Sequence, residues 1–248
     1  MTKYLSSLPV LLRRELASYF ATPVAYVFIV IFLLMAGALS FYLGNLYERE
    51  IADLQPFFQF HPWLYLFLVP AIGMRLWAEE RKAGTIELLL TLPVTTGEAV
   101  LAKFLAAWLF IGLALALTFP IWITVNVLGN PDNGVILAAY IGSWLMAGGF
   151  LAISACLSAV TRSQVVAFII SVVVCFGFLL SGLDMVLDLF RGWLPVSVVD
   201  AIAGLSFLSH FNSIARGVLD LRDLIYFLLV IGFWLFANRI VIEIKKAQ

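Results

Sequence analysis

One short run of the chain combines residue types that could carry out nucleophilic catalysis. Ser206 follows Gly204-Leu205, and His210 lies four residues beyond that serine. A serine nucleophile needs a histidine within reach of its hydroxyl group, and intramembrane serine proteases place the two on different helices. Here both lie in one segment, and Leu208 stands where G-x-S-x-G would have its second glycine. The pattern favours a helix terminus capped by serine hydroxyls, and an intramembrane enzyme would need support from loss of activity in Ser206→Ala.

The two cysteines and the other histidine do not form a metal or redox motif. Cys156 and Cys175 lie inside apolar runs, as small buried side chains do. His61, next to Pro62, is expected at the outer membrane interface. No G-x-x-x-x-G-K-[ST] loop is present, so we do not expect this chain to hydrolyse ATP. We therefore predict no catalytic residue, metal site or bound cofactor in this chain.

A polar stretch from Trp77 to Lys103 could instead support ionic docking. Its charges begin with a mixed cluster that cannot lie in hydrocarbon at acceptable cost: Glu79, Glu80, Arg81 and Lys82. Gly84 follows, and Thr85–Leu92 provides about two helical turns. The apolar side of these turns carries Ile86, Leu89, Leu90 and Pro93, whereas Glu87 points elsewhere.

Local signals predict how this stretch ends. Pro93 should stop the short helix, because the residue before a proline is pushed out of the α region. Thr95 and Glu98 form a capping-box pattern, so a new helix should begin near Thr96. Lys103, about two turns later, is expected to reach the water interface. The stretch is either a solvated loop between two membrane helices or a surface helix that fits a groove on a soluble partner.

The composition identifies the surroundings of this stretch as membrane. The chain has 248 residues, of which 63% are hydrophobic and 12% charged, with a mean hydropathy of +1.06. Soluble domains average about 25% charged residues. The formal net charge of zero gives no electrostatic argument for nucleic-acid binding. We predict an all-α polytopic membrane protein with an amphipathic interfacial helix over residues 1–22.

Apolar runs of membrane length predict six transmembrane helices. Their expected ranges are 24–43, 57–76, 98–127, 135–160, 165–182 and 224–244. Lysine and arginine are concentrated at the ends that share a side with residues 77–103, which places that side and both termini in the cytoplasm. The fourth run carries small residues such as Gly142, Gly148 and Gly149 that permit close helix contact.

Residues 183–223 are too polar to span the membrane and too apolar for a free loop. We predict two short amphipathic or re-entrant helices on the extracytoplasmic side, broken at Gly192–Pro195. Polar residues of this region are candidates for contact with an extracytoplasmic partner or for a gate: His210, Arg216, Asp220, Arg222 and Asp223. The alternative for the last four is a fixed ion-pair network that caps the final helix.

The polar stretch resembles the signature that follows the second transmembrane helix of ABC-2 type transporter permeases. The matching positions are Glu79–Arg81, Gly84-Thr85, Glu87-Leu88, Leu92-Pro93-Val94, Glu98 and Lys103. In that family this region is the coupling helix that seats in the ATPase subunit, and the interfacial helix is an elbow. The resemblance implies ATPase coupling by Glu79, Glu80, Arg81, Lys82, Thr85, Ile86, Glu87, Leu89, Leu90 and Pro93.

The resemblance also implies the partners and the function. A separate ATPase would bind ATP and Mg, and a second copy or a paralogous permease would complete the transporter. The whole chain, 1–248, would be one ABC-2 type transmembrane domain of an exporter in a bacterial inner membrane. A path along the first, second and fifth spans is implied. A non-transporting scaffold that passes ATPase-driven movement to an extracytoplasmic partner would need the same coupling helix and stays open.

The last part of the chain is similar to one branch of these permeases. The runs Leu208–Phe211, Arg216–Asp223 and Ile225–Phe227 resemble the gliding-motility-type permeases. That branch implies an auxiliary membrane protein with a large extracytoplasmic domain.

Overall fold

The structure, a computed structural model, describes residues 7–84, 94–218 and 220–246, and in this part of the chain all regular secondary structure is helical. Its elements are α1 (Ser7–Phe20), α2 (Pro23–Ala38), the π-helical turn η1 (Leu39–Leu43), α3 (Gln55–Phe58), α4 (His61–Gly73), α5 (Arg75–Ala83), α7 (Thr96–Ala116), α8 (Phe119–Leu128), α9 (Asn133–Val160), α10 (Gln164–Leu180), α11 (Asp184–Arg191), α12 (Val196–Ala203), α13 (Phe207–Ala215) and α14 (Leu221–Lys246).

Within the described residues, five helical segments are long and apolar enough to cross a membrane. They are Pro23–Leu43, Gln55–Ala83, Thr96–Leu128, Asn133–Val160 and Leu221–Lys245. A sixth would come from α12 and α13, which are bent by 58° at their junction. The helix expected as the fifth span, α10, is apolar but has only 17 residues, about 26 Å of helix against a hydrocarbon core of about 30 Å. The chain is a multi-pass membrane protein with five to six candidate spans.

Helix α9 is the centre of the bundle. It packs against α4, α5, α7, α10, α13 and α14. Its small residues allow these approaches, as predicted: a Cβ on Gly148 would lie 2.8 Å from Trp108 Nε1, and one on Gly149 3.0 Å from Phe207. The indoles of Trp108 and Trp144 stack at 4.2 Å and each donates to the other's backbone carbonyl, which ties α7 to α9.

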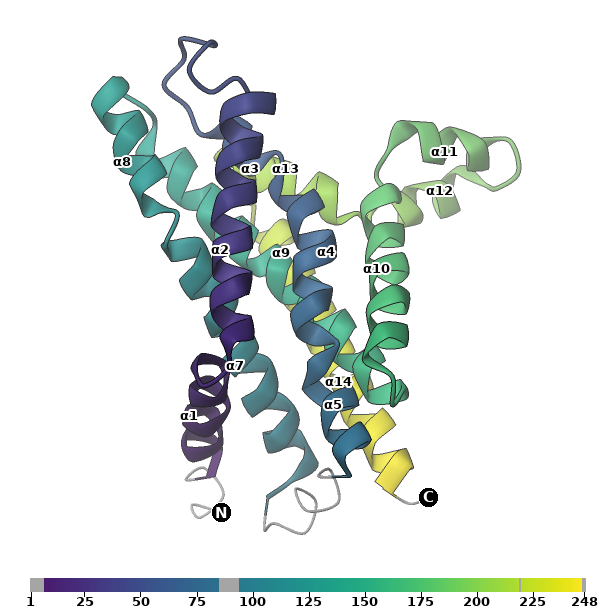
Figure 1. Ribbon diagram of the computed structural model, residues 1–248. Coiled ribbons are helices and arrows are strands. Elements are labelled where there is room, and N and C mark those ends of the chain that lie inside the picture. The colour runs from purple at the N-terminus through teal and green to yellow at the C-terminus, as the bar shows by residue number, and fades with distance from the viewer. Residues whose placement is uncertain (1–6, 85–93, 219, 247–248) are drawn as a thin grey trace.

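Helix α1 is the amphipathic element that the N-terminal pattern predicts. It packs mainly along α7, with Leu11 buried and Tyr19 stacked on Phe110 at 5.1 Å. The opposite side is exposed, as at Val10. The start of α1, the end of α5 and the end of α14 lie at one end of the bundle, here called the junction end (Figure 1).

The opposite end carries α3 and the short helices α11, α12 and α13. The chain does break at residues 192–195, but it forms three short helices, α11, α12 and α13, where two were expected. Figure 1 shows α11 and α12 extending sideways from the end of α10. Helix α13 instead turns inward, where Phe207, Phe211 and Ile214 are fully buried.

The prediction for His61 is wrong. Its side chain is fully buried at the start of α4 rather than exposed at an interface. The Nδ1 atom lies 2.7 Å from the Ser143 hydroxyl, which also lies 2.8 Å from the Tyr65 hydroxyl. Phe32, Phe57 and other aromatic rings surround the imidazole. A polar partner on α9, remote in sequence, makes this burial possible.

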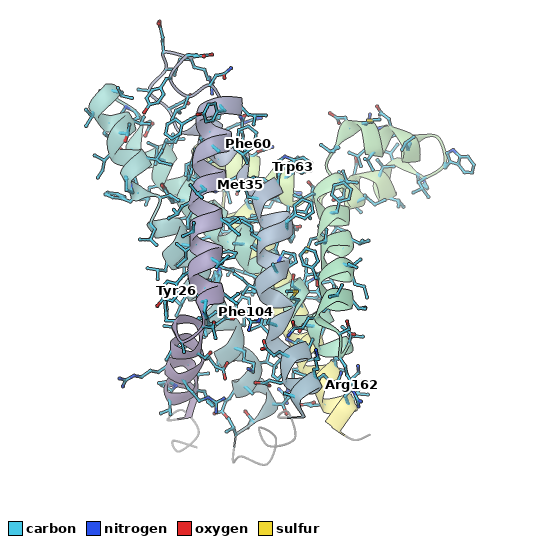
Figure 2. The ribbon with its side chains drawn as sticks, viewed as in Figure 1. Tyr26, Met35, Phe60, Trp63, Phe104 and Arg162 are labelled. Atoms are coloured by element: carbon cyan, nitrogen blue, oxygen red, sulfur yellow. The ribbon has the colours of Figure 1, made fainter. Side chains whose placement is uncertain are left out.

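One face of α2 is left uncovered by the part of the chain that the structure describes. Tyr26, Val30 and Leu34 are 55%, 53% and 66% exposed, and Figure 2 labels Tyr26 and Met35 along this helix. On a membrane helix such a face meets lipid chains or another protein chain.

Candidate functional site

Two well-formed helix caps bound the expected coupling segment. Helix α5 ends at Gly84, whose φ of +72° is a left-handed cap conformation that suits glycine. Helix α7 begins with the predicted capping box, in which Thr95 accepts from the Glu98 amide and Glu98 accepts from the Thr95 amide. The expected docking residues Thr85, Ile86, Glu87, Leu89, Leu90 and Pro93 lie outside the described residues.

A buried ion cluster lies beside these caps and joins three helices. Lys103 Nζ of α7 is 2.6 Å from a carboxylate oxygen of Glu80 on α5 and 3.0 Å from one of Glu15 on α1. The ammonium also lies 5.5 Å from the ring centroid of the buried Trp77. We call Glu15, Lys103, Glu80 and Trp77 the junction cluster.

The position of Lys103 corrects the expectation that it reaches the water interface. The residue is only 5% exposed. A lysine can be buried when carboxylates compensate its charge, and here two are supplied by helices that are distant in sequence. The capping pattern predicted the start of α7 but contained no sign of these partners.

The surroundings of Glu15 in the junction cluster favour its charged form. Burial raises the pKa of Glu15, but the attraction of Lys103 and the hydrogen bonds from Arg14 and Lys103 outweigh it, so the pKa lies below the ordinary value of 4.5. Glu15 is therefore ionised at neutral pH, and it holds α1 against α7 through a charged contact.

The other charges predicted for docking differ in their surroundings. Glu79 pairs with Arg75 one turn earlier at 2.9 Å. Arg81 donates from Nη1 to the Ala159 carbonyl at 2.6 Å, at the end of α9. The side chain of Lys82 is exposed. The structure thus uses Glu79, Glu80 and Arg81 in contacts within the chain.

Ser158 is a contact that sequence reasoning missed. Its hydroxyl accepts from the backbone amides of Trp77 and Ala78 and donates to the Met74 carbonyl. These three bonds lie where α4 gives way to α5, and they satisfy backbone groups at that junction. They fix the first turn of α5 to α9. A serine inside an apolar run carried no signal of this role.

At the opposite end, His210 pairs with Asp223 rather than with Ser206, the serine that precedes it in the G-x-S run. Its Nδ1 lies 2.6 Å from Asp223 and its Nε2 lies 3.1 Å from the Gly204 carbonyl, while the ring stacks on Tyr226 at 3.9 Å. Ser206 caps α13 by accepting from the Ser209 amide. The expected capping role of Ser206 is confirmed, and its hydroxyl is not the hydrogen-bond partner of His210.

The alternative for Arg216, Asp220, Arg222 and Asp223, a fixed ion-pair network, is not formed among the described residues. Arg216, Asp220 and Arg222 are exposed, and Asp220 accepts from the Arg222 backbone amide. Only Asp223 is buried, because His210 supplies its partner. The five candidates therefore divide into one buried pair and three surface residues.

These features define a class of protein: a multi-pass helical membrane subunit with an ion-paired junction of three helices at one end. Comparison with family models matches residues 25–195 to the ABC-2 family transporter proteins. Since the match covers more than half of the chain, this protein belongs to that family, as a membrane permease subunit. The matched region begins within the first turn of α2, continues through α11 and ends just before α12. A search of curated proteins found no match.

Proposed function

We propose that this protein is the permease of an ATP-driven exporter and that residues 77–103 couple it to a separate ATPase. The observation that supports this most is the junction cluster, which fastens both helices flanking residues 85–93 to each other through Lys103 and Glu80. A force applied to residues 85–93, between the two caps, would act on α5 and α7 together. Family membership supports an ATPase partner in general, and that partner would bind the ATP and Mg.

This force would then be transmitted to α9 at the centre of the bundle. Helix α5 is bonded to α9 through Ser158 and Arg81, and α7 is bonded to α9 through the paired indoles. Closure of two ATPases would move these helices as a unit. Rigid-body rocking of one bundle against a second permease would switch access to the path.

The remaining assignments belong to the same proposal. We place the protein in a bacterial inner membrane, with the junction end and both termini in the cytoplasm, and treat residues 1–248 as one transmembrane domain. The second permease is a further copy or a paralogue. The similarity of the last segment to the gliding-motility branch would add an auxiliary subunit at the opposite end, where the exposed Arg216, Asp220 and Arg222 offer charges for contact.

Co-purification tests the docking assignment. The chain is extracted in mild detergent from cells that express it with its own ATPase, and bound ATPase is measured together with ATP hydrolysis. Glu87→Lys should release the ATPase or uncouple hydrolysis from transport. The matched control is Glu48→Lys, an equal charge reversal at an exposed residue in the loop between η1 and α3. Equal ATPase retention and coupling in both variants would refute the assignment.

The exposed α11–α12 pair favours a second candidate, a scaffold that transmits movement without transport. Trp193 is 90% exposed, Met185 83% and Val196 75%, which leaves an apolar surface without a partner in the described chain. Capture of an extracytoplasmic protein that is lost in Trp193→Ser, without substrate accumulation in vesicles, would favour the scaffold. Accumulation that is unaffected by this substitution would favour the exporter.

A further inference from the structure

A crevice of about 650 Å³ lies beside the junction cluster. It is lined by α1, α2, α4, α5 and α7 and reaches Gln164 at the start of α10. Small-molecule sites have volumes of about 300–1,000 Å³. The crevice is therefore large enough for one ligand of moderate size.

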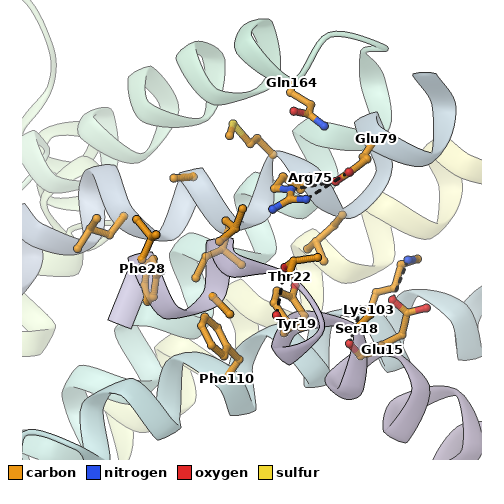
Figure 3. A pocket seen from close by; sticks show the side chains of 18 of the residues that line it. Glu15, Ser18, Tyr19, Thr22, Phe28, Arg75, Glu79, Lys103, Phe110 and Gln164 are labelled. Carbon is orange, nitrogen blue, oxygen red and sulfur yellow. Dashed lines mark hydrogen bonds and ion pairs between the residues drawn. The ribbon is translucent and has the colours of Figure 1, made fainter. Parts of the chain in front are cut away.

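The lining changes from apolar to charged along the crevice. Val24, Phe28 and Ile72 belong to its apolar part, which Phe110 of α7 completes. Arg75, Glu79, Glu15 and Lys103 belong to its charged part. Figure 3 shows Phe28 and Phe110 toward one end and Lys103 and Glu15 toward the other. A ligand that fits this lining has an apolar chain and a polar head.

The apolar part is open toward the side of the bundle. Val24, Val27 and Ile31 line the crevice and are 51%, 54% and 42% exposed. They lie on the uncovered face of α2, a candidate membrane span. A ligand can thus enter from the hydrocarbon phase without crossing the protein core.

The charged part of the crevice favours a head group that carries both a positive and a negative charge. Every cation at the crevice already has a carboxylate neighbour: Arg75 has Glu79, and Lys103 has Glu15 and Glu80. A purely anionic head would meet these carboxylates and would be repelled. A phosphate with an ammonium group attached can instead pair with both members of a salt bridge.

Arg75 and Glu79 can bind such a head group while they stay paired with each other. Both hydrogen bonds that Arg75 makes in the described structure run from Nε and Nη2 to Glu79. Its Nη1 group, with two further N–H donors, has no partner among the described residues. The side chains are 30% and 49% exposed, so a head group can reach them.

We propose that this crevice binds one zwitterionic phospholipid of the adjacent leaflet, with its phosphate at Arg75, its ammonium at Glu79 and an acyl chain along α2. This proposal goes beyond the transport function, because the lipid is a resident ligand rather than the cargo. The bound lipid fills the space between α1, α2 and α5 next to the junction cluster.

Native mass spectrometry of the purified protein, with defined lipids added after delipidation, tests the proposal. The probes are phosphatidylethanolamine and phosphatidylglycerol with identical acyl chains. Val27→Trp introduces a bulky side chain into the crevice, whereas Val30→Trp makes the same change three residues further on α2, at 53% exposure but outside the lining. Arg75→Gln removes the donor for the phosphate.

The expected result is one tightly retained phosphatidylethanolamine in the wild type and in Val30→Trp, and its loss in Val27→Trp. Arg75→Gln should weaken retention by about tenfold or more, the change that accompanies loss of one hydrogen bond to a charged group. Equal retention in the two tryptophan variants would overturn the site, because it would indicate a general lipid coat. Stronger retention of phosphatidylglycerol would overturn the zwitterionic head. ATPase co-purification is measured on the same samples, so a failed docking assignment is recognised separately.

Discussion

Lys103→Met should destabilise the protein more than removal of any exposed cation. The change deletes the ammonium but keeps an unbranched stem against Trp77. With an effective dielectric constant of about 20, Coulomb's law gives roughly 5–7 kcal/mol of attraction for each contact, at 3.0 and 2.6 Å. Desolvation of the ammonium and repulsion between the two carboxylates oppose much of this. Removing one partner of a buried ion pair costs about 3–5 kcal/mol in measured cases.

The lower part of that range applies here. The Glu15 and Glu80 side chains are 14% and 21% exposed, so water can partly solvate them when Lys103 is lost. A loss of about 3 kcal/mol corresponds to a fall in Tm of roughly 6–12 °C for a chain of this size. The assay is thermal unfolding in detergent, followed by a thiol-reactive dye, because Cys156 and Cys175 are both buried and free.

Arg239→Met is the matched control for this measurement. Arg239 pairs with Glu243 at 2.8 Å, but the two side chains are 54% and 45% exposed. Exposed pairs contribute about 0–1 kcal/mol, so this variant should lose at most a few degrees. A Lys103→Met shift no larger than that of Arg239→Met would refute the buried junction cluster. Adding Glu15→Gln to Lys103→Met should cost less than the sum of the single changes, because the two residues share one contact.

Three further predictions concern other parts of the bundle. Gly148→Ala should destabilise by about 1–3 kcal/mol because its Cβ would overlap Trp108 and Ile231, whereas Gly177→Ala, with open space around its Cβ, should not; thermal unfolding of both variants checks this. Acid should weaken the contact of Glu15. Its pKa in the folded protein is lower than the ordinary value, so its charge adds stability above about pH 4.5, and this stability is lost as the pH falls through the folded pKa. The difference in Tm between wild type and Glu15→Gln should therefore shrink below pH 4.5. Ser143→Ala should lower the free energy of unfolding by about 1–3 kcal/mol, because it leaves the buried His61 without its hydrogen-bond partner. Ser143→Thr keeps the hydroxyl group and should lose less.

The parts of the fold that sequence predicted are those set by neighbouring residues. The capping box at Thr95 and Glu98 needs only four consecutive positions, and the membrane spans need only a sustained apolar run. The close contacts at Gly148 and Gly149 were anticipated from residue size alone. Each of these signals is complete within one element, so no knowledge of the packing was required.

The parts that sequence missed depend on partners that are distant in the chain. Lys103 meets Glu15 across 88 positions, His61 meets Ser143 across 82, and Ser158 reaches back to Met74 across 84. A lone lysine, histidine or serine in an apolar run has several possible environments, and only the packing of the helices selects one. The sequence therefore predicted the caps on either side of residues 85–93, but not the contacts that Lys103, Glu15 and Glu80 make with one another.

The hydrogen bonds and ion pairs of α5 and α7, the helices that flank the proposed coupling segment, constrain how movement can pass through the molecule. Helices α5 and α7 are bonded to each other through the junction cluster and separately to α9 through Ser158 and Trp108. Sliding α5 along α9 would break the three hydrogen bonds of Ser158 at once, whereas rocking the three helices together breaks none. Helix α2 differs: the side-chain hydrogen bonds of its described residues stay within its own turns or run to α1. We therefore expect α5, α7 and α9 to move as one body, and α2, with its uncovered face, to be the helix whose position adjusts.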